Sequence, residues 1–255
     1  MWKNLIACGR HHTPRLLGAG LVIAAALGVA LRRALPVEGD YPLKLAALVL
    51  YLTGLASFLS LAKERHDLRM DLPRFELIKA WPLSAREILW GEVLGISLMA
   101  SGYGAIGWTA AVALLELPAS AELAFDWPQR VALWLSGIPV IAAGVLSFVA
   151  VQNAAALLFP TWVKLGPDQS AEVTKFGGYA FVLGLSSAIA GALALGPLLL
   201  TVPLYVLGTV LVTPAPFGWA VPAAWLSALL VLVEVWILLR FLERRVETFA
   251  PSSVA

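Results

Sequence analysis

Long apolar runs dominate this sequence and restrict it to few folds. At about 20 residues per bilayer crossing, six segments can span a membrane, and they cover residues 16–31, 43–62, 88–115, 131–159, 176–212 and 223–239. The runs are continuous and rich in Leu, Ala, Val and Gly, whereas a transmembrane barrel alternates polar and apolar residues over about ten positions. The sequence therefore predicts an all-α, polytopic membrane protein with about six transmembrane helices in a single permease-like domain over residues 1–255.

The composition agrees with this class and argues against others. Hydrophobic residues make up 60% of the 255 residues and charged residues only 13%, and the mean hydropathy is +0.84, above the range of water-soluble domains. A single cysteine allows no intramolecular disulfide, and no Cys/His cluster indicates a structural zinc site. No basic, aromatic-interleaved patch is present, so we expect no nucleic-acid partner.

The distribution of Lys and Arg predicts the orientation. With six crossings and a cytoplasmic N-terminus, fourteen of the 18 basic residues fall in inner segments and four in outer segments. Positively charged loops are retained in the cytoplasm. We therefore expect a multi-pass protein of the inner (plasma) membrane with both termini cytoplasmic.

The fifth apolar segment is too long for one crossing. As a single helix, residues 176–212 would extend about 55 Å, against a hydrocarbon core of about 30 Å. Gly196 and Pro197 provide a break near its middle, and Pro203 provides a second one. We expect one crossing up to about residue 195, followed by an outer re-entrant or interfacial hairpin and loop over residues 196–221, because a further crossing would move the basic tail outside.

Residues 63–87, here called the island, form the one strongly charged segment between apolar runs. Within it, Leu68, Leu72, Phe75 and Ile78 recur at spacings of three and four, which predicts a short amphipathic helix. Pro82 should end that helix. Ser84 is a candidate N-cap for the next span, because a glutamate follows three residues later.

The residue inventory gives no sign of an enzyme. The chain has no G-x-x-x-x-G-K-[ST] phosphate loop and no H-E-x-x-H helix, and no predicted span contains a histidine. We therefore expect no catalytic residue, cofactor or metal site.

Three polar residues inside spans are candidates for a role within the membrane. Glu234 is the one acid deep in a predicted crossing, where charges are costly and commonly functional. The alternative is that it reaches water at the inner end or pairs with a neighbouring helix. Gln152 and Asn153 are amides of the kind that hydrogen-bond between membrane helices.

Two stretches carry a family resemblance. They read DLRMDLPRFELIKAWPLSAREILWGEVLG over residues 67–95 and QNAAALLFPTWVKLGP over residues 152–167. Together they resemble the ABC exporter permeases, which are bacterial membrane subunits related to the type-two ABC transporter superfamily. In that family an acidic-basic motif precedes a K-x-x-P-L turn, and a later N-A-A-x-L-L-F-P-x-W-V-x-L-G-P stretch closes a span.

The resemblance implies a function for the island. It would be the cytoplasmic coupling helix, which docks in a groove of a separate ABC ATPase subunit and transmits its closure to the membrane. The expected ATPase-coupling residues are Asp67, Arg69, Asp71, Pro73, Phe75, Lys79, Pro82 and Leu83. The apolar stripe with charged rims fits such docking, since short amphipathic helices fill partner grooves in this way.

The resemblance also bears on assembly. Members are often about twice this length, which implies a second permease half, either a further copy of this chain or a related one, unless the chain is a truncated remnant. The expected function is that of a membrane-embedded permease subunit exporting an unidentified substrate. The alternative is a non-transporting membrane scaffold or assembly protein whose island is an ordinary protein-binding loop.

Overall fold

The structure is a computed structural model that describes residues 68–71, 75–114, 126–159 and 216–248, together with isolated positions at 46, 48–49, 184, 188–189, 203 and 205–207. Its elements are α4 (Leu68–Asp71), α5 (Phe75–Lys79), α6 (Ala85–Leu114), α7 (Trp127–Leu158) and α9 (Pro216–Thr248). No strand occurs among these residues. The prediction of an all-helical fold is therefore confirmed for this part of the chain.

Three of the helices are long and apolar enough to cross a membrane, over Ala85–Ala113, Trp127–Leu158 and Trp219–Thr248. They correspond to the third, fourth and last of the six predicted spans. The other three spans lie outside the described residues apart from a few isolated positions, which are helical. Six crossings thus remain a prediction.

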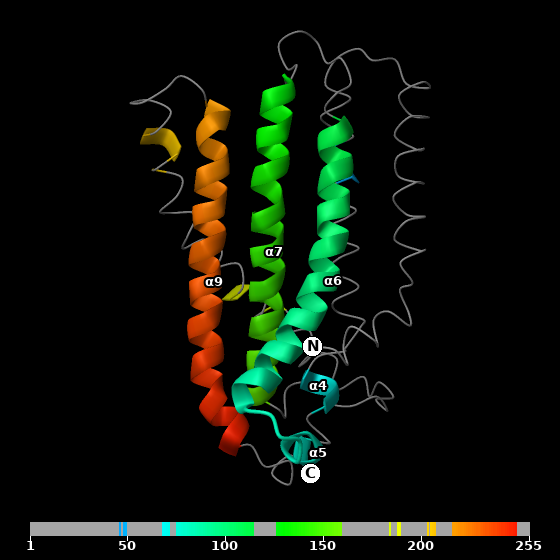
Figure 1. Cartoon of the computed structure of the whole chain (residues 1–255), viewed down its shortest axis with the longest axis vertical. Coiled ribbons are helices and arrows are strands. Elements are labelled where there is room, and N and C mark those ends of the chain that lie inside the picture. Colours follow the sequence, from blue (N-terminus) through cyan, green and yellow to red (C-terminus); the bar gives the residue numbers. More distant parts are fainter. Residues whose placement is uncertain are drawn as a thin grey trace.

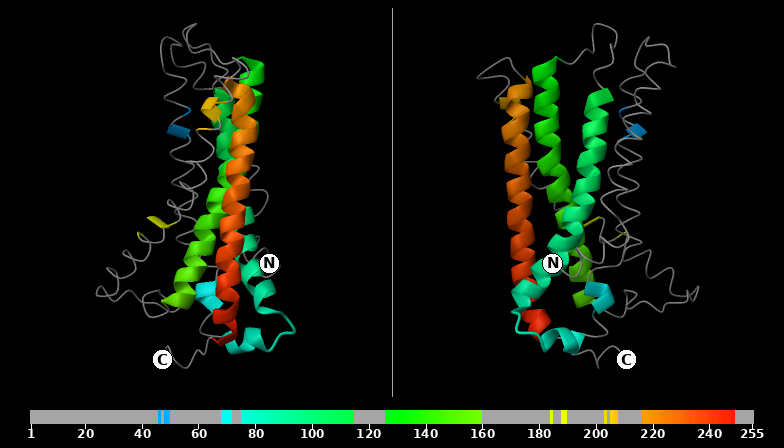
Figure 2. Two further views of the ribbon diagram at one scale, coloured as in Figure 1. Left: turned by 90° about the vertical axis from the view of Figure 1, so that its left-hand side faces the viewer. Right: turned by 45° about the vertical axis from the view of Figure 1, so that its right-hand side comes forward.

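The three long helices run side by side, with α6 opposite in direction to the other two (Figure 1). α7 and α9 are parallel and pack against each other most extensively, while α6 runs antiparallel and packs mainly against α7. Figure 2 shows the same three helices from two further sides. Their shared core contains Leu89 and Val93 of α6, Ala150 of α7, and Val235 and Leu239 of α9.

The last helix is longer than predicted. The sequence indicated a start near Pro222, with residues up to 221 in an outer loop, yet α9 already begins at Pro216 and continues through Pro222. Proline is favoured in the first turn of a helix, where its missing N–H has no intrahelical partner. Interior prolines such as Pro222, and Pro139 in α7, are tolerated in membrane helices because neighbouring groups can satisfy the freed carbonyls.

Hydrogen bonds from two tryptophans connect α6 to α7 near the end where α7 begins. The Trp108 indole Nε1 donates to the carbonyl oxygens of Leu133 at 3.1 Å and Trp134 at 3.3 Å. The Trp134 indole Nε1 donates in return to the hydroxyl of Thr109 at 2.9 Å. Gly137 makes this close approach possible, because a β-carbon there would collide with the Trp108 ring.

Candidate functional site

The island packs at one end of the bundle, here called the charged end, where α6 begins and α7 and α9 end (Figure 1). Six of the seven Lys and Arg residues in the described ranges belong to elements at this end, and they are Arg69, Lys79, Arg86, Arg240, Arg244 and Arg245. The seventh, Arg130, stands in the first turn of α7 at the opposite end. The charged end is therefore the most polar part of the described surface and the place to look for a partner site.

Asn153 connects the island to α7. Its side-chain oxygen accepts a hydrogen bond from the backbone N–H of Leu68 at 3.0 Å, and its amide nitrogen donates to the Val149 carbonyl one turn earlier at 2.9 Å. Leu68 is the first residue of α4, and the first N–H groups of a helix have no intrahelical acceptor. A fully buried side chain of α7 thus caps α4.

Lys79 connects the island to α9. Its ammonium group donates to the backbone carbonyl of Glu247 at 2.9 Å and lies 5.6 Å from the centre of the Phe75 ring. Glu247 is the penultimate residue of α9, where carbonyl groups lack intrahelical donors and the helix dipole favours a cation. The last residue of α5 therefore caps the end of α9.

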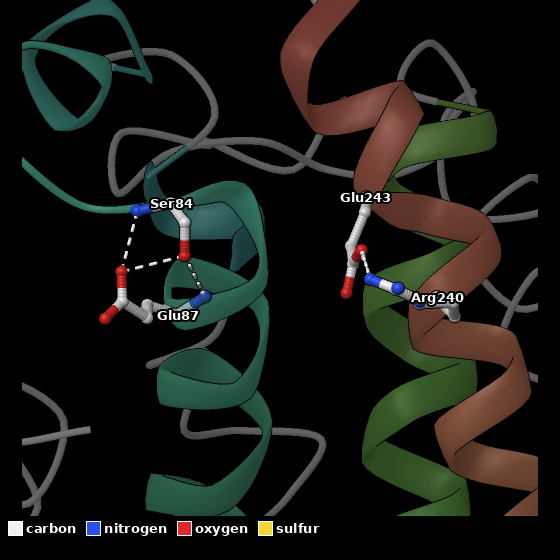
Figure 3. A network of polar contacts seen from close by, with 4 residues as sticks. All are labelled: Ser84, Glu87, Arg240 and Glu243. Carbon is white, nitrogen blue, oxygen red and sulfur yellow. Dashed lines mark hydrogen bonds and ion pairs between the residues drawn. The ribbon is translucent and has the colours of Figure 1, made fainter.

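The island continues directly into α6 through the predicted cap (Figure 3). The Glu87 carboxylate accepts hydrogen bonds from the Ser84 N–H and hydroxyl, both at 2.8 Å. The Glu87 N–H donates back to the Ser84 hydroxyl at 3.3 Å. This reciprocal pair is a capping box, and the prediction from the Ser-x-x-Glu spacing is confirmed.

The described part of the island's apolar stripe faces the chain's own helices, while Leu72 lies outside the described residues. Leu68 and Phe75 are fully buried and Ile78 is buried, and all three belong to the core shared with α6, α7 and α9. The stripe that the sequence offered as a docking face for a partner is therefore already occupied. Burial of this stripe, with the bonds of Asn153 and Lys79, holds the island against the membrane helices.

A second apolar surface of the island points outward. Leu77 is 67% exposed and Trp81 52% exposed, and Ala80, Pro82 and Leu83 beside them are also exposed. We call residues 77–83 the outer turn. Hydrogen bonds from the Trp81 N–H to the Ile78 carbonyl and from the Leu83 N–H to the Trp81 carbonyl hold its backbone in a compact turn.

The structure divides the predicted coupling residues between these surfaces. Lys79, Pro82 and Leu83 are exposed, Asp71 at the end of α4 is half-buried, and Phe75 lies in the interior. Arg69 lies in α4, with its backbone alone described, whereas Asp67 and Pro73 lie outside the described residues.

The predicted intramembrane residues do not form one cluster. Gln152 and Asn153 are buried near the charged end of α7. Glu234 is half-buried in α9 on the line of Ser227 and Val231, at the edge of the buried face, and its Oε2 is buried without a hydrogen-bond partner among the described residues. This position agrees with the tendency of membrane carboxylates to face the bundle rather than lipid.

An open apolar groove of about 360 Å³ lies between the long helices, away from the charged end. Trp108, Gly137 and Ile141 line it together with Tyr205 and Ala224. Its few polar side-chain groups are three hydroxyls and the Trp108 indole N–H, none of them charged, which suits a hydrophobic ligand or lipid chain more than a charged one. Within the described ranges, no three His, Cys, Asp or Glu residues gather as a metal site would require.

The sequence analysis missed two features of the charged end. It gave no role to Leu77 and Trp81, because it assigned the apolar residues of the island to a single stripe. It also used the arginines of α9 only to orient the chain. The available signal was the four-residue spacing between Trp236, Arg240 and Arg244, which places all three on one helical line.

Comparisons with known protein families, with curated proteins and with solved structures find no match for this chain.

Proposed function

We propose that this chain is the membrane-spanning permease subunit of an ABC-type exporter and that a separate ATP-hydrolysing subunit docks on the outer turn. Two permease halves, either two copies of this chain or this chain and a related one, would line the export path. The chain supplies no catalytic residue in this scheme. The substrate would be moved by rearrangement of the helices when the ATPase subunits close.

The observation that carries the proposal is the way in which the island is attached. It is bonded to α7 through Asn153 and to α9 through Lys79, and it runs into α6 through the capping box of Ser84. A force applied to the outer turn therefore reaches all three described membrane helices within a few residues. A loop that only binds a partner does not require hydrogen bonds to three membrane helices.

The outer turn has the chemistry of a small protein-docking surface. Its exposed Leu77, Trp81 and Leu83 provide apolar anchors, and Arg86 at its edge provides a charged rim. Buried aromatic and aliphatic anchors inside a polar rim are typical of binding hot spots. The excess of basic residues at this end supports a cytoplasmic location, where an ATPase subunit would be found.

Photo-crosslinking from the outer turn tests the proposal. A photoreactive amino acid would replace Leu77 in the full chain in its native membrane. Leu98, which is also exposed but lies within the span of α6, provides the matched control. We expect Leu77 to crosslink to a protein that carries a phosphate-binding loop and hydrolyses ATP, and Leu98 to give no such product.

Other outcomes would contradict the proposal. Crosslinks from Leu77 to lipid alone would show that the outer turn lies in the headgroup region, where tryptophan is commonly found. Crosslinks to a protein without ATPase activity would favour the alternative, a non-transporting scaffold or assembly protein. A second test uses Leu77→Asp, which should abolish co-purification of ATPase activity while the chain still inserts in the membrane.

A further inference from the structure

A cleft of about 410 Å³ lies on the surface of α9 near the charged end. Its lining residues form two helical lines with a spacing of four, one of Trp236, Arg240 and Arg244, the other of Ile237, Phe241 and Arg245. Each line begins with an apolar side chain toward the middle of the helix and ends with an arginine toward the charged end. At 1.5 Å per residue, the two lines extend about 14 Å along the helix axis.

The charge of the cleft is not balanced by the described part of the chain. Arg240 donates from Nη1 to the Glu243 carboxylate at 2.6 Å (Figure 3). Arg244 and Arg245 are exposed, and their side chains form no ion pair within the described ranges. The cleft thus combines two guanidinium groups that have no ion-pair partner among the described residues with a third that is only partly neutralised.

An anion in this cleft would be held by side chains. The cleft lies at the C-terminal end of α9, where the helix dipole is negative and disfavours an anion. Guanidinium groups compensate for this, since each offers several donors arranged to match phosphate oxygens. The exposed Trp236, Ile237 and Phe241 lie on the bilayer side of Arg244 and Arg245, where they can contact glycerol and acyl chains.

From this arrangement we infer that the cleft binds one anionic phospholipid of the cytoplasmic leaflet. Its phosphate lies between Arg244 and Arg245, and its first acyl carbons lie along Trp236 and Phe241. A free phosphate would use the arginines but would leave the apolar half of the cleft without a ligand. The inference is independent of ATPase docking, since the outer turn lies on the island and the cleft on α9.

Lipid retention by the full chain tests this inference. The chain would be reconstituted in nanodiscs containing equal amounts of phosphatidylglycerol and phosphatidylcholine, then re-extracted in mild detergent, and the retained lipids would be counted by mass spectrometry. We expect phosphatidylglycerol to be enriched with wild-type chain. The double variant Arg244→Gln, Arg245→Gln should lower the enrichment about tenfold or more, since each basic residue at an anionic surface contributes roughly a fivefold preference.

The matched control is Arg86→Gln, which removes an exposed arginine at the same end outside the cleft. It should leave the enrichment unchanged, and Arg244→Lys with Arg245→Lys should retain part of it because the charge remains. Equal losses in Arg86→Gln and the double variant would indicate diffuse attraction and overturn the inference. The inference would also be overturned if the glutamine double variant eluted as the wild type does and kept its lipid enrichment. Displacement of the lipid by excess inorganic phosphate would overturn it as well.

Discussion

Replacement of Asn153 by alanine should loosen the island without unfolding the bundle. The substitution removes the acceptor of the Leu68 N–H, a bond of 3.0 Å between fully buried residues. A buried backbone donor left without an acceptor costs about 1–3 kcal/mol, whereas hydrogen bonds between membrane helices average about 0.6 kcal/mol and reach about 1.7 kcal/mol. We therefore expect the closed position of α4 to lose about 1–2 kcal/mol.

Amide hydrogen exchange of the full chain in nanodiscs measures this loss directly. Since 1.4 kcal/mol corresponds to a factor of ten, peptides that contain Leu68 should exchange roughly 5 to 30 times faster in Asn153→Ala than in the wild type. The interior of α7 should keep its protection. The expected change is thus confined to the island and its contact with α7.

Ser147→Ala is the matched control for this experiment. Ser147 is also buried in α7, but its hydroxyl donates within the helix to the Gly144 carbonyl at 2.9 Å, so its loss should leave the exchange of Leu68 unchanged. If Asn153→Ala exchanged at the wild-type rate around Leu68, or if Ser147→Ala had the same effect, the bond from Asn153 would not be what holds α4. The argument for mechanical attachment of the island to α7 would then fail.

Two other substitutions test local features of the long helices. Ser84→Ala removes the capping box with Glu87 and should cost about 0.5–2 kcal/mol, seen as faster amide exchange in the first turn of α6 with unchanged exchange in α9. Gly137→Ala drives a β-carbon into the Trp108 ring and should lower the free energy of unfolding by about 1–3 kcal/mol, as overpacking does. Gly144→Ala in the same helix meets nothing within 4 Å, so it should be neutral or slightly stabilising in the same denaturation assay, and equal effects of the two glycine variants would contradict the packing argument.

Much of the fold in the described ranges was predictable because it depends on local or compositional physics. An apolar run of about 20 residues must satisfy its backbone within a helix when it crosses lipid, so α6, α7 and α9 appear where the runs are. The cap formed by Ser84 and Glu87 depends on residues three apart, and a spacing of three is readable in any sequence. The start of α9 was placed too late, because Pro222 was taken as a boundary although proline is tolerated within membrane helices.

The candidate site was predictable only in part. The sequence identified the island and Asn153, but it assigned the apolar stripe of Leu68, Phe75 and Ile78 to an external partner, and the structure buries that stripe in the chain's own core. Periodicity reveals that a helix has an apolar face, yet it does not say what covers that face. As a result, the surface left for a partner is the outer turn around Leu77.

The sequence by itself determined the class of the protein, the positions of the described spans and the cap of α6, because each follows from the affinity of a short stretch for lipid, water or its own backbone. Tertiary structure decided that Asn153 caps α4, that Lys79 reaches the carbonyl of Glu247, and that Trp108 lies over Gly137. These contacts join residues from 29 positions apart, for Trp108 and Gly137, to 168 positions apart, for Lys79 and Glu247. They form only when the helices pack, since local sequence preferences do not specify which group of a distant segment will come within bonding distance.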